Sequence, residues 1–216
     1  VRGGAKRERG SSKVLWATMA WAAGGECQNF SVPLLHGMRE LLHEVGENAA
    51  HWYCEGELAP VHYMVLRSGH PDYFSLGGDL KHFRSCIERK DREGLFQYSR
   101  LCLDILYAWA TSLNQQATTI ALVQGRALGG GFEAALSTDY LIAEEHSEFG
   151  FPEILFGLFP CTGGMNLLAR RVGVYEAERM MIDGRIYSAA ELKEKGVVDE
   201  ICPRGEGTLA ANRFIA

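Results

Sequence analysis

The hydrophobic positions of this chain change spacing repeatedly, and each spacing predicts a different kind of element. Between residues 32 and 45 they recur three and four positions apart, which predicts an amphipathic helix that ends at Gly46. A longer stripe with the same spacing follows Asp91, a residue suited to capping the N-terminus of that helix. The residues of this second stripe are Leu95, Tyr98, Cys102, Ile105, Trp109 and Leu113.

Short apolar runs bounded by turn residues are typical of buried strands, and they alternate with the helical stretches. They predict strands at residues 14–20, 62–67, 118–123, 140–143 and 197–201. Strands that alternate with helices along a chain indicate an α/β fold.

The last third of the chain is predicted to be mainly helical. Helical spacing follows Gly163 at residues 165–172, 176–182 and 189–195. The third of these segments begins with Ser188 and Glu191 in the arrangement of a capping box and stops at Gly196.

The N-terminal residues 1–13 are polar and rich in Gly and Ser, so we expect them to be disordered or tag-like. The apolar run 14–23 that follows is similar to a secretory signal. However, Glu8 interrupts the preceding basic stretch, and a buried first strand explains the same run. No apolar segment approaches the ~20 residues needed to span a membrane, and we expect a cytoplasmic protein.

The composition narrows the classes of function. A chain of 216 residues fits one domain with a sizeable core, and its net charge of −5 argues against a nucleic-acid partner. A local basic patch for a small anionic ligand stays compatible with this charge. None of the six cysteines has C-x-x-C or zinc-site spacing, which indicates reduced thiols and no metal.

Two glycine-rich turns are the first candidates for chemistry, at residues 74–80 and 125–136. The second follows a predicted strand and opens a helix, where free backbone N–H groups suit a phosphate or an oxyanion hole. No Gly-Lys-Ser/Thr follows, as a P-loop requires, and the glycines are consecutive rather than spaced as in a dinucleotide fingerprint. The alternative for each turn is close backbone packing alone.

Two glutamates are the second candidates. Glu133 follows the triple glycine, where it could also compensate the helix dipole. Glu153 lies in the apolar segment 149–156, where a carboxylate is paired, protonated or functional unless it simply reaches the surface. No competing catalytic set is present, because His43-Glu44 lacks the second His of a zincin and no serine lies in a G-x-S-x-G elbow.

Together these segments resemble the crotonase (enoyl-CoA hydratase/isomerase) superfamily. The 74–80 turn is similar to the family's first oxyanion turn, and the 125–136 turn to its second, with the first catalytic glutamate at Glu133. The family's second catalytic glutamate, in a Pro-Glu-Ile-Leu setting, falls on Glu153, 20 positions later. The similarity extends over residues 14–207, nearly the whole chain.

The resemblance implies a spiral of ββα turns over residues 14–207. Residues 208–216 would begin a C-terminal helical region that is shortened or missing, and the protein would be a homotrimer or hexamer. One departure bears on the shape of the pocket: Cys161-Thr162-Gly163-Gly164 stands where family members usually have Gly after the Pro.

The resemblance also implies the chemistry. The N–H groups of Gly78 and Gly130 would hold the oxygen of an acyl-CoA or acyl carrier protein thioester, with no metal or redox cofactor. Glu133 would activate water and Glu153 would protonate the α-carbon. The expected substrate pocket consists of Leu76, Leu128, Gly129, Phe132, Phe156 and Phe159, although some of these apolar residues belong to the core under the simpler interpretation.

Within the superfamily, the chain most resembles diffusible-signal-factor synthases, chiefly in residues 91–106 and 131–137. These enzymes make cis-2-unsaturated fatty acids from 3-hydroxyacyl thioesters, which implies dehydratase and thioesterase activities and a sensor kinase as a partner. Two alternatives stay open, an ordinary enoyl-CoA hydratase/isomerase of fatty acid metabolism and a non-enzymatic partner-binding protein. Acyl chain length, carrier and double-bond geometry are not determined by the sequence.

Overall fold

The computed structural model describes residues 5–6, 14–20, 28–54 and 57–216. The described part of the chain is built around a six-stranded sheet of order β1-β2-β5-β7-β9-β12, parallel except where β1 pairs with β2. Its strands are β1 (Ala5–Lys6), β2 (Val14–Met19), β5 (Tyr63–Ser68), β7 (Thr118–Val123), β9 (Tyr140–Glu144) and β12 (Glu200–Cys202).

A second, four-stranded sheet has the order β11-β10-β8-β6. Its strands are β6 (Tyr73–Ser75), β8 (Arg126–Leu128), β10 (Glu148–Gly150) and β11 (Ile186–Ser188). The chain passes repeatedly from the large sheet to the small sheet and then into a helix. These ββα units are β5-β6-α2 (Leu80–Glu88), β7-β8-α5 (Gly130–Leu136) and β9-β10-α6 (Gly164–Val172), with the 3-10 helix η1 (Pro152–Phe156) before α6. The predicted α/β class and the ββα spiral are confirmed.

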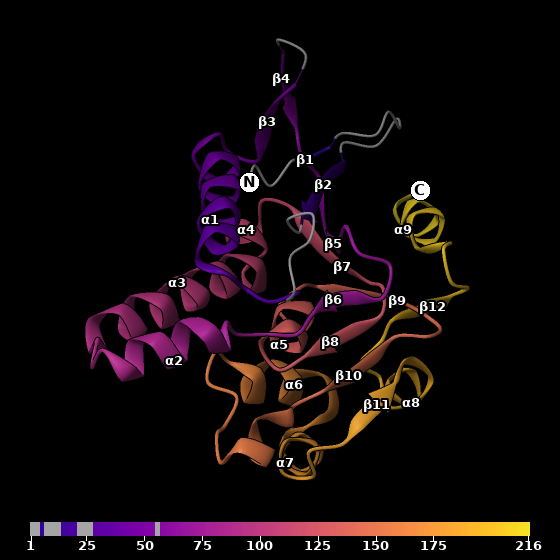
Figure 1. Ribbon diagram of the computed structural model, residues 1–216. Helices are drawn as coiled ribbons and strands as arrows, with labels where there is room; N and C mark the ends of the chain where they lie inside the picture. The colour runs from indigo at the N-terminus through magenta and orange to yellow at the C-terminus, as the bar shows by residue number, and fades with distance from the viewer. Residues whose placement is uncertain (1–4, 7–13, 21–27, 55–56) are drawn as a thin grey trace.

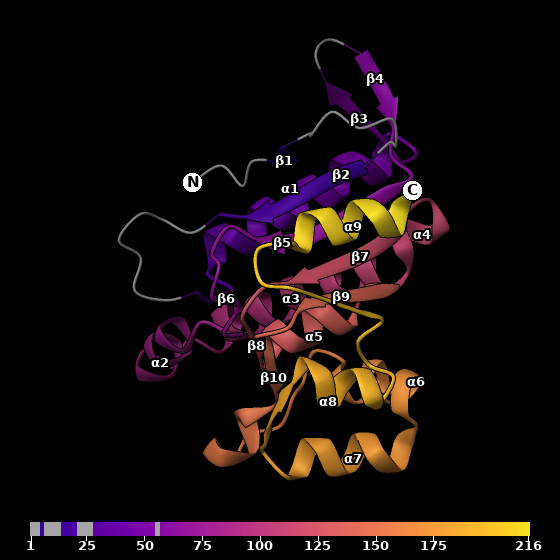
Figure 2. The same ribbon diagram turned by 90° about the vertical axis from the view of Figure 1, so that its right-hand side faces the viewer.

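Helices cover both faces of the large sheet (Figures 1 and 2). In β5, Met64 and Leu66 pack into the core formed with α1 (Val32–Glu47) and α3 (Arg92–Ala110). The intervening Val65 packs on the opposite side, against α9 (Gly207–Ile215). Because side chains alternate across a strand, burial on both faces explains why the central strands are continuous apolar runs.

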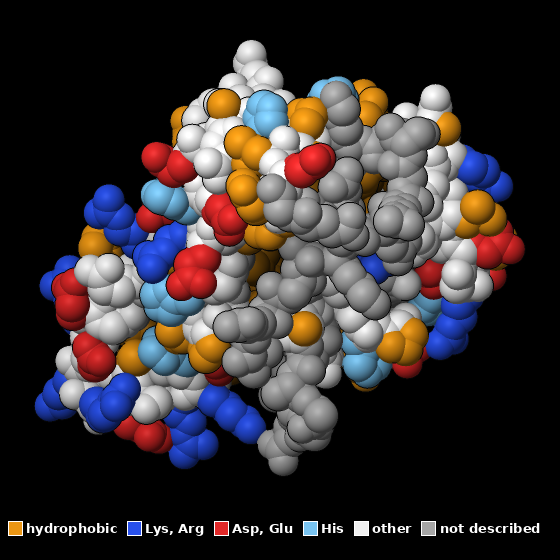
Figure 3. All heavy atoms as spheres, turned by 90° about the horizontal axis from the view of Figure 1, so that it is seen from above, with side chains coloured by type: hydrophobic (Ala, Val, Ile, Leu, Met, Phe, Trp, Pro, Cys, Tyr) orange, Lys and Arg blue, Asp and Glu red, His pale blue; other side chains and the backbone are white. Residues whose placement is uncertain are grey.

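The remaining elements lie at the two ends of the molecule. The hairpin of β3 (His51–Cys54) and β4 (Glu57–Pro60) projects from one end, and α7 (Val174–Ile182) and α8 (Ala189–Glu194) lie beside α6 at the other (Figure 2). Figure 3 views the hairpin end, where Lys and Arg side chains are interspersed with Asp and Glu around the rim instead of forming a patch of one sign. None of the helices that the structure describes is long and apolar enough to cross a membrane.

Several local predictions are confirmed. β7 has the predicted bounds, and the Asp91 carboxylate accepts a hydrogen bond from Gly94 N at 2.8 Å, which caps α3. The capping box at the start of α8 is also present, since the Ser188 hydroxyl accepts from Glu191 N and the Glu191 carboxylate accepts from Ser188 N.

Several predicted boundaries are wrong, including the end of α1 and the start of the last strand. α1 does not end at Gly46 but continues to Glu47. The last strand begins at Glu200 rather than Val197, because the N–H groups of Val197 and Val198 both bond to Leu192 O and close the end of α8.

Leu113 was predicted on the stripe of the long helix, but α3 ends at Ala110. The next turn, α4 (Ser112–Gln115), is left-handed, with φ between 50° and 64° at its four residues. Both carboxylate oxygens of Asp139 accept from the Ser112 hydroxyl at 2.8 Å and anchor this turn. Leu113 is nevertheless buried. Its hydrophobic character therefore predicted its burial correctly, although its spacing wrongly placed it on the long helix.

Of the predicted disordered or tag-like segment 1–13, the structure describes only the β1 residues; the rest lies outside the described residues. The start of the run that is similar to a secretory signal forms β2, a largely buried strand of the central sheet. Residues 21–23 of that run also lie outside the described part of the chain.

Candidate active site

The two glycine-rich turns lie against each other, backbone to backbone. A methyl group added to Gly77, which has φ of +87°, would lie 2.8 Å from Leu128 O and 2.9 Å from Gly130 N. A methyl group on Gly130 would lie 3.7 Å from Gly78 N. Only glycine allows the turn after β6 to approach the N-terminus of α5 this closely.

Both predicted oxyanion donors are free. Within the described residues, the N–H groups of Gly78 and Gly130 donate to no other protein group. Their neighbours are engaged, because Gly129 N donates to Gly150 O at 2.9 Å and Gly77 N donates to the Ser75 hydroxyl at 3.2 Å. Two free donors on facing turns are what an oxyanion hole requires.

A tyrosine that the sequence analysis assigned only to an apolar stripe braces the first turn. The buried Tyr98 hydroxyl donates to Phe30 O at 2.6 Å and accepts from Asp79 N at 3.0 Å. Phe30 N in turn donates to Gly77 O at 2.8 Å. The available signal was the hydroxyl itself, since a tyrosine on a buried helix face needs a hydrogen-bonding partner.

Glu133 lies in the first turn of α5 and is 3% exposed. Its Oε1 accepts from Thr162 N at 3.0 Å and from Gly164 N at 2.8 Å, and its Oε2 accepts a hydrogen bond from the Thr162 hydroxyl. Burial raises the pKa of Glu133, and these three hydrogen bonds act in the opposite direction because they stabilise the ionised form.

Glu153 lies on η1 and has a different environment. Its Oε2 is buried and accepts no hydrogen bond from another described group. Burial, reinforced by the nearby negative charge of Glu133, raises the pKa of Glu153 to about 7. A methyl group on Gly129 would lie 2.5 Å from Glu153 Oε1, so this carboxyl group lies directly against the second glycine turn.

The structure therefore brings Gly78, Gly129, Gly130, Glu133 and Glu153 together. The environments of the two carboxyl groups differ: three hydrogen bonds oppose the rise that burial causes in the pKa of Glu133, whereas the pKa of Glu153 is raised to about 7. Such a pair can remove a proton at one position and deliver one at another.

The predicted pocket residues are more dispersed. Phe132 is fully buried and packs against the rings of Phe149 and Phe151, at centroid distances of 5.3 and 4.9 Å, so it lies in the core. Leu128 is partly buried, and Leu76 is 39% exposed. Phe156 and Phe159 belong to a run of exposed apolar side chains after Glu153. This exposed apolar run consists of Ile154, Leu155, Phe156, Leu158 and Phe159.

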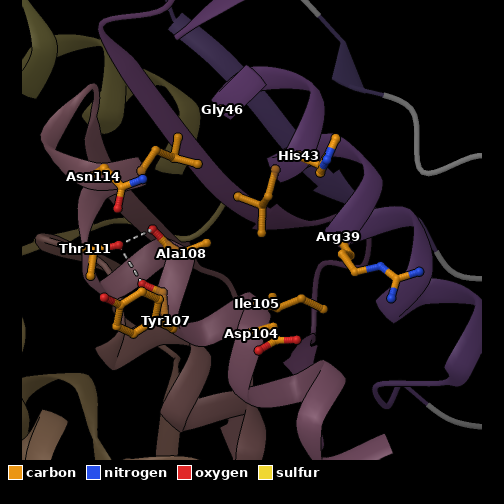
Figure 4. A pocket seen from close by; sticks show the side chains of 11 residues that line it. Arg39, His43, Gly46, Asp104, Ile105, Tyr107, Ala108, Thr111 and Asn114 are labelled. Atoms are coloured by element: carbon orange, nitrogen blue, oxygen red, sulfur yellow. Dashed lines mark hydrogen bonds between the residues drawn. The ribbon is translucent and has the colours of Figure 1, made fainter. Parts of the chain in front are cut away.

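A separate pocket of about 240 Å³ lies between α1, α3 and the left-handed turn (Figure 4). Arg39, His43 and Asp104 line it, and none of the predicted site residues does. In the part of the chain that is described, no group of three or more His, Cys, Asp or Glu side chains could hold a metal ion. The glutamate pair beside the free N–H groups is thus the candidate active site.

The spiral of ββα units, with two carboxyl groups beside two free backbone donors, defines a protein of the crotonase fold class. Residues 40–213 match the family model described as enoyl-CoA hydratase/isomerase, and the chain belongs to this family.

Curated relatives are hydratases by name. The chain is 37% identical over 126 residues to a "Probable enoyl-CoA hydratase" of Rhizobium meliloti, which is 58% of this chain and 49% of that protein. It is 32% identical over 161 residues to the mevalonyl-coenzyme A hydratase SIDH of Beauveria bassiana, covering 71% of this chain and 54% of that protein. The chain thus spans about half the length of the curated relatives it matches.

Solved structures agree on the fold. An enoyl-CoA hydratase from Bacillus anthracis has a TM-score of 0.79 at 25% identity, covering 96% of this chain and 73% of that one. Pseudomonas aeruginosa DspI has a TM-score of 0.77 at 24% identity, covering 96% of this chain and 77% of that one. At this level of identity, the likeness to DspI shows the fold alone.

Proposed function

We propose that this protein adds water to, or removes it from, the Cα–Cβ bond of an acyl thioester. The observation that carries the proposal is the contrast between the two glutamates. Glu133 accepts hydrogen bonds from three donors, whereas Oε2 of Glu153 accepts none from another described group. Both carboxyl groups lie beside the N–H groups of Gly78 and Gly130, which have no hydrogen-bond acceptor among the described residues. The hydratase names of the relatives support the same class of reaction.

Each group has a distinct role in the proposed mechanism. The N–H groups of Gly78 and Gly130 hold the thioester oxygen as it gains negative charge, and losing one such donor typically costs ~3 kcal/mol. In hydration, Glu133 takes a proton from water while the water oxygen bonds to the β-carbon, and Glu153 gives its proton to the α-carbon. Dehydration reverses both transfers, so Glu153 takes the α-proton and Glu133 protonates the departing hydroxyl.

The test is the turnover of 2-enoyl-CoA with Glu133→Gln and Glu153→Gln. Each variant should lose at least ~100-fold in kcat, as expected when a general acid or base is removed. Glu145→Gln, which changes an exposed glutamate, is the matched control, and thermal melts check that every variant folds. Near-wild-type turnover by either site variant would exclude the two-glutamate mechanism.

A second candidate is a signal-synthase-like enzyme that dehydrates a 3-hydroxyacyl thioester and then hydrolyses it to a free 2-unsaturated fatty acid. Residues 91–106 support it by resemblance. The exposed apolar run after Glu153 supports it as well, because burying an acyl chain there would contribute ~0.8 kcal/mol per CH₂. In the hydrolysis, water activated by Glu133 adds to the thioester carbon, the C–S bond breaks and the thiol leaves with a proton.

Supplying 3-hydroxydodecanoyl thioester, on CoA and on acyl carrier protein, separates these candidates. Free acid above the no-enzyme control supports the synthase. A hydration equilibrium without free acid eliminates the synthase and leaves the hydratase. Absence of turnover on either carrier favours the non-enzymatic alternative, which retention of both glutamates argues against.

The assembly and the cellular context are further proposals from the family resemblance. A homotrimer or hexamer would be detected by light scattering of the purified protein. A cytoplasmic location and a sensor-kinase partner would be tested by fractionation and by co-purification from the native cell.

A further inference from the structure

The segment in which this chain departs from the family pattern contacts the candidate base directly. Cys161, Thr162, Gly163 and Gly164 connect the loop after η1 to α6. Two backbone N–H groups of this segment, from Thr162 and Gly164, converge on Oε1 of Glu133. Gly164 must be small for this approach, because a methyl group there would lie 3.0 Å from that oxygen.

The two carboxylate oxygens of Glu133 accept different numbers of hydrogen bonds. A carboxylate oxygen has two lone pairs, and both acceptor positions of Oε1 are used by backbone donors. Among the described residues, Oε2 accepts only from the Thr162 hydroxyl, so it keeps one lone pair. A proton taken from water by Glu133 would therefore arrive at Oε2.

The Thr162 hydroxyl has no competing structural task. The N-cap of α6 is Gly163, and no side chain caps this helix. Among the described residues, the Thr162 side chain bonds only to Glu133, on an element that the chain passed about thirty residues earlier. A hydroxyl kept for local turn geometry would instead bond within its own loop.

We propose that Thr162 is a positioning residue for Glu133: its hydroxyl fixes the rotation of the carboxylate and keeps Oε2 ionised and available as the proton-accepting atom. The expected change in kcat rests on the proposed hydratase function. The expected change in the pKa of Glu133 does not depend on that function.

The energetics agree with this role. A carboxylate that is 3% exposed needs donors to stay ionised. Burial raises the pKa of Glu133, and the hydroxyl of Thr162 is the largest of the contributions that lower it. Removing that hydroxyl leaves both backbone donors in place, so the contact can be deleted without redesigning the loop.

The experiment compares Thr162→Val, which lacks the hydroxyl, with Thr162→Ser, which retains it. Thr162→Ala is a second deletion in case the valine variant folds poorly. Thr111→Val is the matched control, because within the described part of the chain the Thr111 hydroxyl bonds only to the carbonyl groups of Tyr107 and Ala108 on α3. NMR titration of isotope-labelled glutamate side chains in the ligand-free protein, assigned with Glu133→Gln, reports the pKa of Glu133.

In Thr162→Val and Thr162→Ala the pKa of Glu133 should rise above the wild-type value, while Thr162→Ser and Thr111→Val should leave it close to wild type. With crotonyl-CoA, kcat of the deletion variants should fall roughly 10- to 100-fold, as for loss of a hydrogen bond to a charged group, with little change in KM. The acidic limb of the pH–rate profile should move to higher pH, and serine should restore it.

The outcomes separate the two proposals. An unchanged Glu133 titration in both deletion variants overturns the positioning role, whatever the kinetics show. Full activity of Glu133→Gln, or no activity of the wild type, overturns the proposed function. The titration still decides the Thr162 contact in that case.

Discussion

At the scale of single residues, the two glutamates illustrate how neighbours set a charge state. Glu133 is the more buried of the two, yet it has three hydrogen-bond donors. Glu153 is only partly buried, but its Oε2 has no donor, and the charge of Glu133 disfavours its ionisation. The hydrogen-bond donors oppose the effect of burial on the pKa of Glu133, and Oε2 of Glu153 has no such donor among the described groups.

This asymmetry predicts a pH-dependent gain in stability for Glu153→Gln. The pKa of Glu153 rises from its ordinary value of 4.5 to about 7 on folding, so protonation stabilises the folded state fully below pH 4.5, and this stabilisation is lost as the pH rises through 7. The glutamine side chain does not titrate. Melting temperatures of the variant should therefore increasingly exceed those of the wild type between these pH values and keep a constant lead above pH 7.

The control for this prediction is Glu145→Gln, which changes an exposed glutamate and is melted over the same pH range. A Glu153→Gln variant that is less stable than the wild type at pH 8 would show that the carboxylate has a partner that stabilises it.

The sequence was sufficient to select both glutamates, because each stands in a short, distinctive segment. It could not identify Thr162 as a support of Glu133 or Tyr98 as a support of the first glycine turn. Thr162 reaches back to Glu133 from beyond η1, and Tyr98 reaches the glycine turn from the middle of α3. Contacts of this kind depend on how distant segments pack, and no local spacing encodes them.

At the scale of elements, the close approach of α5 to β6 explains why the second turn contains glycine. A methyl group on Gly131 would lie 2.2 Å from Ser75 O, so α5 packs directly on the backbone of β6. A methyl group added to Gly37, within α1, would have no neighbouring atom within 4 Å. The two glycines therefore have opposite tolerances to an added side chain.

Gly131→Ala should destabilise the protein by about 2 kcal/mol or more, because α5 and β6 must separate, a cost in the range of overpacked cores. Gly37→Ala should be neutral or stabilise it by up to ~1 kcal/mol through helix propensity. Urea unfolding of both variants measures the difference. Equal stability of the two variants would contradict the packing of α5 on β6.

The long periodic helices α1 and α3 and the continuous apolar strand β7 were predicted from the sequence with few errors. The three-residue strands β6, β8 and β10 were missed. They are too short to show a period, and they exist because they pair with one another across consecutive ββα units. The left-handed turn after α3 was missed because its conformation depends on Asp139, more than twenty residues further along the chain.

At the scale of the whole molecule, the candidate site collects parts from three consecutive ββα units. The first unit supplies Gly78, the second supplies Gly130 and Glu133, and the third supplies Glu153 and Thr162. The spiral thus places at one location groups that are far apart in the sequence. The large sheet and its two helical faces act as the frame that holds these three units in register.

The contact between the Gly77 and Gly130 turns also bears on the order of folding events. Joining segments from successive parallel units requires long loops to close, which makes this contact slow to form. In refolding experiments, the proposed hydratase activity should return in the same slow phase as the burial of Trp16 and Trp109, each 1% exposed. Activity that returned well before the tryptophan signal would contradict this order. An incompletely folded chain would carry both glutamates without the facing N–H groups of Gly78 and Gly130, so the proposed activity would be absent until the last units dock.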